Sequence, residues 1–108
     1  MLKVYTSRIS YRGKDRWNIT VQTGSKIFAP SWDLVMGIKK GQITEKQYTD
    51  AYLLMMKESY KKNRKEWDNL LAKDRIVLVC YCPAGAFCHR YLLANILVKL
   101  GATYEGEI

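Results

Sequence analysis

The fold is decided by residues 75–100, which read RIVLVCYCPAGAFCHRYLLANILVKL. The continuous apolar run Ile76 to Val79 predicts a central strand over Arg75–Cys82, because a strand covered on both faces has no need to alternate apolar and polar residues. Pro83-Ala84-Gly85 then predicts a loop, and apolar residues spaced three and four apart predict a helix over Cys88–Leu100. A strand, a loop and a helix in this order begin a βαβ unit, so we expect a mostly parallel sheet flanked by helices.

The rest of the chain supplies further strands and helices. Runs of strand-forming residues predict two early strands, separated by a turn, and one short final strand: Leu2–Ile9, Trp17–Thr23 and Ala102–Glu105. Ser31 predicts the cap of a short helix that stops before Gly41, and the capping box Thr44–Gln47 predicts the start of a long helix. Asn63 is expected to interrupt the long helix, which then resumes over 65–71.

Length, charge and cysteine content limit the class of protein. A chain of 108 residues is of ordinary size for one domain, so 1–108 is interpreted as a single α/β domain. The formal net charge of +8 indicates an anionic partner. The longest apolar run is too short to cross a membrane, and the three cysteines lie together instead of being spread as a disulfide framework. We therefore expect a cytoplasmic protein with reduced thiols and no membrane partner, either alone or as a homo-oligomer.

The predicted sheet also indicates where a ligand would bind. Ligands of parallel α/β sheets bind beyond the carboxyl ends of the strands. Cys82 to Arg90 follow the central strand, and Ser7, Arg8 and Ser10 lie at the end of the first strand. These two segments are the predicted site.

His89 and Arg90 are unusual residues for the first turn of a helix. The N-terminus of a helix carries a partial positive charge and therefore favours carboxylates over cations. Residues 75–104 contain no aspartate or glutamate to balance Arg90. Two interpretations follow: an external anion such as phosphate binds Arg90 and nearby backbone N–H groups, or a distant carboxylate forms a structural ion pair, with Asp15, Asp33 and Glu45 as candidates.

The cysteines leave three interpretations open. Cys80, Cys82, Cys88 and His89 together could hold zinc, but the usual Cys-x2-Cys spacing is missing, so we expect no metal and no cofactor. Cys88, at a helix N-terminus beside His89 and Arg90, is the best candidate nucleophile, although the Cys-x5-Arg loop of tyrosine phosphatases is absent. Packing as a small apolar group is the third interpretation and is favoured for Cys80.

His89, the single histidine, has two interpretations of its own. Its ordinary pKa suits a general acid or base. A histidine that hydrogen-bonds a backbone carbonyl would have the same appearance in the sequence.

Two motifs resemble the bacterial and viral family called domain of unknown function 488. They are Cys80-Tyr81-Cys82 and Phe87-Cys88-His89-Arg90 followed by a Leu/Ala-rich helix ending in Leu100-Gly101; residues 5–8 and 28–32 also resemble family members. The resemblance implies a Rossmann-like three-layer fold in which Arg8, Cys88, His89 and Arg90 meet at one pocket. Many members have a glutamate where this chain has Cys82, and its loss favours binding over catalysis.

The favoured function is binding of an anionic small molecule, derived from a nucleotide or phosphorylated, which the protein could sequester as a signal. The expected ligand-binding residues are Arg8, Ser10, Trp32, Cys82, Cys88, His89 and Arg90, and the aromatic candidates for stacking a base are Tyr11, Phe28 and Trp32. An enzyme that acts on a nucleotide or a nucleic acid component is the alternative, with Cys88 or His89 as the catalytic residue. Nucleic-acid binding through the lysines of 57–65 is the second alternative.

Overall fold

The computed structural model describes residues 1–21, 24–82 and 87–108. Within them the elements follow the order β1 (Lys3–Arg8), β2 (Arg16–Asn18), α1 (Trp32–Lys39), α2 (Glu45–Lys62), α3 (Arg64–Leu71), β3 (Arg75–Cys80), α4 (His89–Lys99) and β4 (Thr103–Glu107). The predicted α/β class is confirmed, and each predicted strand and helix has a counterpart in this order.

The strands form one parallel sheet in the order β2-β3-β1-β4. In the central strand β3 every residue from Ile76 to Cys80 is buried, as the continuous apolar run predicts. The register pairs Arg8 of β1 with Cys80 of β3, and Asn18 of β2 with Val79. The carboxyl ends of these three strands therefore lie along one edge of the sheet.

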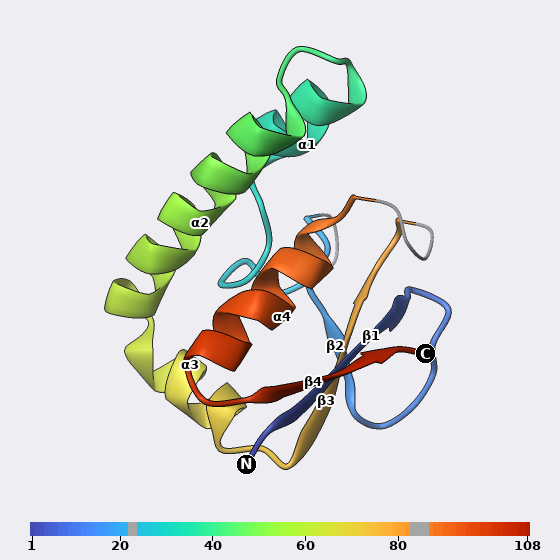
Figure 1. Cartoon of the computed structure of the whole chain (residues 1–108), viewed down its shortest axis with the longest axis vertical. Helices are drawn as coiled ribbons and strands as arrows, with labels where there is room; N and C mark the ends of the chain where they lie inside the picture. Colours follow the sequence, from blue (N-terminus) through green and yellow to red (C-terminus); the bar gives the residue numbers. More distant parts are fainter. Residues whose placement is uncertain (22–23, 83–86) are drawn as a thin grey trace.

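Helix α4 is the main cover of the sheet, and α2 packs along the outer side of α4 (Figure 1). Leu93, Ala94 and Leu97 of α4 lie in the same apolar core as Ile76 and Leu78 of β3. The family resemblance implies a three-layer fold. The contacts between helices and strands establish one layer of helices on the sheet, and they do not confirm the third layer.

The helices begin and end where the caps predict. The Ser31 hydroxyl accepts a hydrogen bond from the Leu34 N–H at the start of α1. At the start of α2 both bonds of the capping box form: Gln47 N–H donates to Thr44 Oγ1, and Thr44 N–H donates to Gln47 Oε1. Asn63 separates α2 from α3, as expected. Among the described residues, no helix is both long and apolar enough to span a membrane.

Two predicted strands end earlier than expected. The second strand was expected to reach Thr23, but β2 ends at Asn18, and residues 22–23 lie outside those described. The central strand was expected to reach Cys82, but β3 ends at Cys80. Apolar and strand-forming side chains continue past both ends because they line a cavity there. The predicted loop over 83–85 also lies outside the described residues.

Candidate thiol-lined ligand site

A cavity of about 390 Å³ lies beyond the carboxyl ends of β2 and β3. Its walls come from the segment after β2, from α1, from the start of α2, and from the two segments that flank residues 83–86. The lining residues are Thr20, Val21, Trp32, Val35, Ile38, Lys39, Glu45, Tyr48, Cys80, Tyr81, Cys82, Phe87, Cys88 and His89. Most of this surface is apolar or aromatic, with thiols on one side. The site is thus at the edge of the sheet where parallel α/β folds bind ligands.

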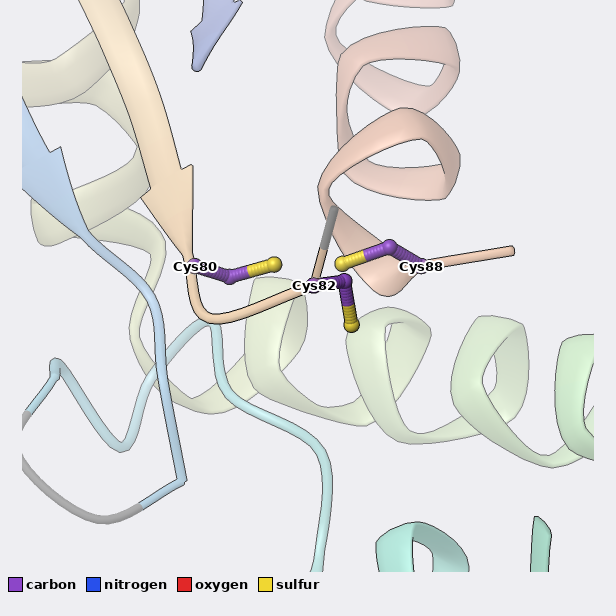
Figure 2. A group of neighbouring side chains, drawn as sticks. All are labelled: Cys80, Cys82 and Cys88. Atoms are coloured by element: carbon purple, nitrogen blue, oxygen red, sulfur yellow. The ribbon is translucent and has the colours of Figure 1, made fainter. Parts of the chain in front are cut away.

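Three cysteine thiols gather on one wall of this cavity. Cys80 is the last residue of β3, Cys82 follows it by two residues, and Cys88 is the N-cap of α4. Their sulfur atoms all lie within 4.8 Å of one another. Figure 2 shows the side chains of Cys80 and Cys88 pointing toward each other, with Cys82 beside them. All three are free thiols; Cys80 and Cys88 are buried, whereas Cys82 is half-buried.

Arg90 lies behind the thiols, fully buried. Its Nη1 donates to Cys80 Sγ at 3.0 Å and to the Cys82 carbonyl at 2.9 Å. Its Nη2 donates to Glu107 Oε2 at 2.9 Å. Burial opposes the charged guanidinium, but the hydrogen bonds with Cys80 and Glu107 outweigh burial and raise the pKa of Arg90. The guanidinium is therefore a permanent positive charge held against the thiols.

The neighbouring thiols change one another's acidity. Hydrogen bonds from Cys80 and Cys88 lower the pKa of the Cys82 thiol to about 3, and the charge of Arg90 acts in the same direction. Hydrogen bonds with Cys80 and Cys82, together with burial, raise the pKa of Cys88. Cys82 is therefore the more acidic of these two thiols.

His89 is buried, and both of its ring nitrogens have neighbours. Nε2 donates to the Ile19 carbonyl at 2.6 Å, and Nδ1 lies 3.8 Å from Cys88 Sγ. Burial lowers the pKa of His89, so the ring is neutral. This is the arrangement of the structural interpretation, in which the histidine bonds a backbone carbonyl, although the ring also lines the cavity.

Of the two interpretations of Arg90, the contacts match the structural ion pair with a distant carboxylate and not the external anion. The carboxylate is Glu107 of β4, which is none of the three candidates named from the sequence. It was missed because it lies three residues beyond the acid-free window, and because β4 extends past the predicted strand end at Glu105. Since β4 is parallel to β1 and adjacent to it, Glu107 is carried to the edge where α4 begins. The guanidinium is bound by protein groups and is absent from the cavity lining.

The family model for DUF488-N3a, described as the active DUF488-N3 subclade, matches residues 1–101. The chain belongs to this family. Comparison with curated proteins and with solved structures gave no match. In this DUF488-N3a chain, the Cys-His-Arg run that carries the resemblance supplies the N-cap of α4, the buried histidine and the buried guanidinium.

The DUF488-N3a fold brings four of the seven expected ligand-binding residues to the cavity: Trp32, Cys82, Cys88 and His89. Arg8 and Ser10 are exposed and do not line it, because they lie at the end of β1 and just after it, and β1 is on the far side of β3 from β2. Of the aromatic candidates, only Trp32 lines the cavity. The Tyr11 hydroxyl donates to Asp15 Oδ1, and Phe28 is a core residue packed edge-on against Trp67.

Several lining residues were not singled out from the sequence. Cys80 was interpreted as packing, but its thiol belongs to the cluster. Lys39 and Glu45 are the charged residues among the described lining, and Tyr48 forms part of the wall. Tyr48 is an aromatic residue directly after the capping box, and that position was an available signal. Glu45 was named from the sequence only as a candidate partner of Arg90, and nothing local in the sequence marks Lys39.

Proposed function

We propose that the chain binds a small, nucleotide-derived molecule in this cavity and so could sequester it. The observation that carries the proposal is a cavity of about 390 Å³, walled by aromatic side chains, at the carboxyl edge of a parallel sheet. Ligand pockets in proteins range from roughly 300 to 1,000 Å³ and are mostly apolar, with a few polar groups that set orientation. A nucleobase with its sugar matches both the size and the character of these walls.

The aromatic residues suit a planar ring. Trp32 is 49 % exposed although it lines the cavity, so part of its ring face is open for stacking. Tyr48 and Phe87 also line the cavity and pack edge to face, with 5.2 Å between their ring centroids. A flat heterocycle in the cavity would therefore have aromatic carbon to pack against.

The charged residues of the cavity limit how many phosphate groups a ligand can have. Lys39 can bind one phosphate or carboxylate group, and Glu45 can accept a hydrogen bond from a ring amine or a sugar hydroxyl. Arg90 is bound by Glu107 and by the thiol cluster, so it does not add a second site for phosphate. A nucleoside monophosphate therefore fits the cavity better than a polyphosphate.

Titration calorimetry with nucleosides and nucleoside monophosphates tests this proposal. Trp32→Ala should weaken binding about 5- to 150-fold, because base–aromatic stacking contributes about 1–3 kcal/mol. Leu54→Ala removes an exposed apolar side chain outside the cavity and should bind like wild type. Lys39→Gln should weaken the monophosphate more than the nucleoside, whereas the neighbouring Lys40→Gln should not. Equal affinities for all four variants, or no binding by wild type, would contradict the proposal.

The half-buried thiol of Cys82, which faces the cavity, favours a second candidate function. In that case the chain is a hydrolase or transferase. The Cys82 thiolate attacks an electrophilic carbon or phosphorus of the bound nucleotide, the bond to the leaving group breaks as the bond to sulfur forms, and water or a second acceptor then displaces the sulfur. Cys88 and His89 were the catalytic candidates from the sequence; both are buried, and Cys82 is the more accessible thiol. Recovery of the ligand chemically unchanged after long incubation would support binding alone, whereas turnover lost in Cys82→Ser would support the enzyme.

A further inference from the structure

We propose that Cys80, Cys82 and Cys88 form a binding site for a thiophilic divalent metal ion of the zinc type. This inference goes beyond the proposed small-molecule function and does not depend on it. It departs from the expectation drawn from sequence spacing, which lacked the Cys-x2-Cys pattern of structural zinc sites. The strand end and the helix start bring the three sulfurs together despite that spacing.

The distances between the sulfurs are close to those of a metal site. The three atoms lie within 4.8 Å of one another, and no disulfide uses any of them. Zinc–sulfur bonds of about 2.3 Å in a tetrahedron place sulfurs roughly 3.8 Å apart. The side chains therefore need to move inward by no more than about 1 Å, a change that cysteine rotamers and the loop position of Cys82 can supply.

The charges around the cluster also fit a metal–thiolate complex better than apolar packing. A divalent ion bound by three thiolates has one net negative charge. The Arg90 guanidinium, which is paired with Glu107, also lies with Nη1 3.0 Å from Cys80 Sγ and can hydrogen-bond a ligating sulfur. Donors of this kind orient metal ligands and raise metal affinity in known sites. Three apolar packing groups would gain nothing from a buried guanidinium.

The set of ligands leaves one position open. His89 is not the fourth ligand in this proposal, because it lies outside the group of mutually close donors. All three thiols line the cavity, so a fourth position would face it. Three protein ligands and one exchangeable position are typical of zinc sites that bind water or substrate.

The test is a titration of the full reduced chain with Zn²⁺, in competition with a chromophoric chelator, repeated with Cd²⁺ to detect thiolate-to-metal charge transfer. We expect one ion per chain and a charge-transfer band. Each of Cys80→Ser, Cys82→Ser and Cys88→Ser should lower affinity at least about 100-fold, since even an indirect contact to a ligand is worth 10–100-fold. His89→Gln keeps a side-chain N–H for the Ile19 carbonyl and should bind the ion like wild type.

A second measurement uses only the wild-type chain, so its result does not depend on whether the serine variants fold. Stoichiometric Zn²⁺ should protect all three thiols of the wild-type chain from alkylation, as counted by mass spectrometry. Alkylation that is unchanged by Zn²⁺, equal affinity in the serine variants, or loss of binding in His89→Gln would overturn the three-thiol site. Nucleotide binding by the metal-free chain is measured separately, so the failure of one proposal is distinguishable from the failure of the other.

Discussion

At the scale of single residues, the molecule depends on a charged group in its interior. Arg90 is fully buried, and its charge is balanced by Glu107, whose side chain is 25 % exposed. The sequence shows that Arg90 is an unusual residue for the first turn of a helix. It does not show which carboxylate pairs with Arg90, because that partner comes from a strand elsewhere in the chain. The location of that partner depends on sheet order, which a single sequence does not encode locally.

Glu107→Gln should lower the free energy of unfolding by about 2 kcal/mol. Removing one member of a buried ion pair leaves an uncompensated charge, and the partial exposure of Glu107 keeps the loss below the 3–5 kcal/mol typical of full burial. Urea denaturation followed by circular dichroism measures the change. Glu105→Gln, on the same strand but outside the ion pairs of the described residues, is the control and should stay within about 0.5 kcal/mol of wild type. A Glu107→Gln chain as stable as wild type would mean that the ion pair is energetically neutral.

Asp15 makes the stability of the fold depend on pH in the acid range. Hydrogen bonding from Tyr11, assisted by Arg75, lowers its pKa below the ordinary value of 3.8. A carboxyl whose pKa is depressed in the folded state stabilises that state above its unfolded pKa, and the contribution is lost as pH falls through the folded pKa. Tyr11→Phe should therefore raise the pKa of Asp15 and move the acid-unfolding midpoint to higher pH. Carbon-detected NMR titration of the Asp15 carboxyl measures this, and an unchanged pKa would show that Tyr11 is not the main cause.

At the scale of elements, patterns within short stretches of sequence predict most of what is observed. The apolar run of β3, the Ser31 cap and the Thr44–Gln47 capping box each predict an element that the structure contains. The site is predicted in part. Cys82, Cys88 and His89 follow from the strand-to-helix connection, whereas Arg8 and Ser10 were included because the position of β1 relative to β2 and β3 was unknown.

Thr44→Ala should lower the free energy of unfolding by about 1 kcal/mol, because it removes the hydroxyl that caps α2. The substitution should also weaken the binding of a ligand in the cavity, because the first turn of α2 places Glu45 and Tyr48 in the cavity lining. Thr49→Ala, one turn further along, removes a bond to the Glu45 carbonyl but no cap, and it should change stability by less than about 0.5 kcal/mol. Thermal denaturation of both variants compares them, and equal losses would contradict the capping argument.

At the scale of the whole molecule, a group of exposed lysines lies outside the cavity lining. The lysines at 57, 61, 62 and 65 are exposed on α2 and α3, and none of them lines the cavity. Charge of this kind attracts nucleic acid without reading its sequence. The cavity and the lysine-rich face are therefore separable by mutation.

We expect only weak, salt-sensitive binding to nucleic acid. With about three phosphate contacts, affinity for a DNA duplex should fall roughly 40-fold between 50 and 200 mM salt. The double variant Lys61→Glu with Lys62→Glu should abolish this binding and leave zinc and nucleotide binding unchanged. Fluorescence anisotropy at several salt concentrations measures it. Tight binding at 200 mM salt that still falls steeply as salt rises would instead support the nucleic-acid alternative, and a flat salt response would contradict it.

The pairing of Arg90 with Glu107 also bears on how the protein is made. Ribosomes synthesise chains from the N-terminus, so the central strand β3 and the arginine emerge before β4 does. Until β4 adds to β1, the guanidinium has no carboxylate and is better kept in water than buried. Docking of the last strand should therefore be a late step of folding, and a nascent chain stalled before residue 107 should remain open around its three cysteines.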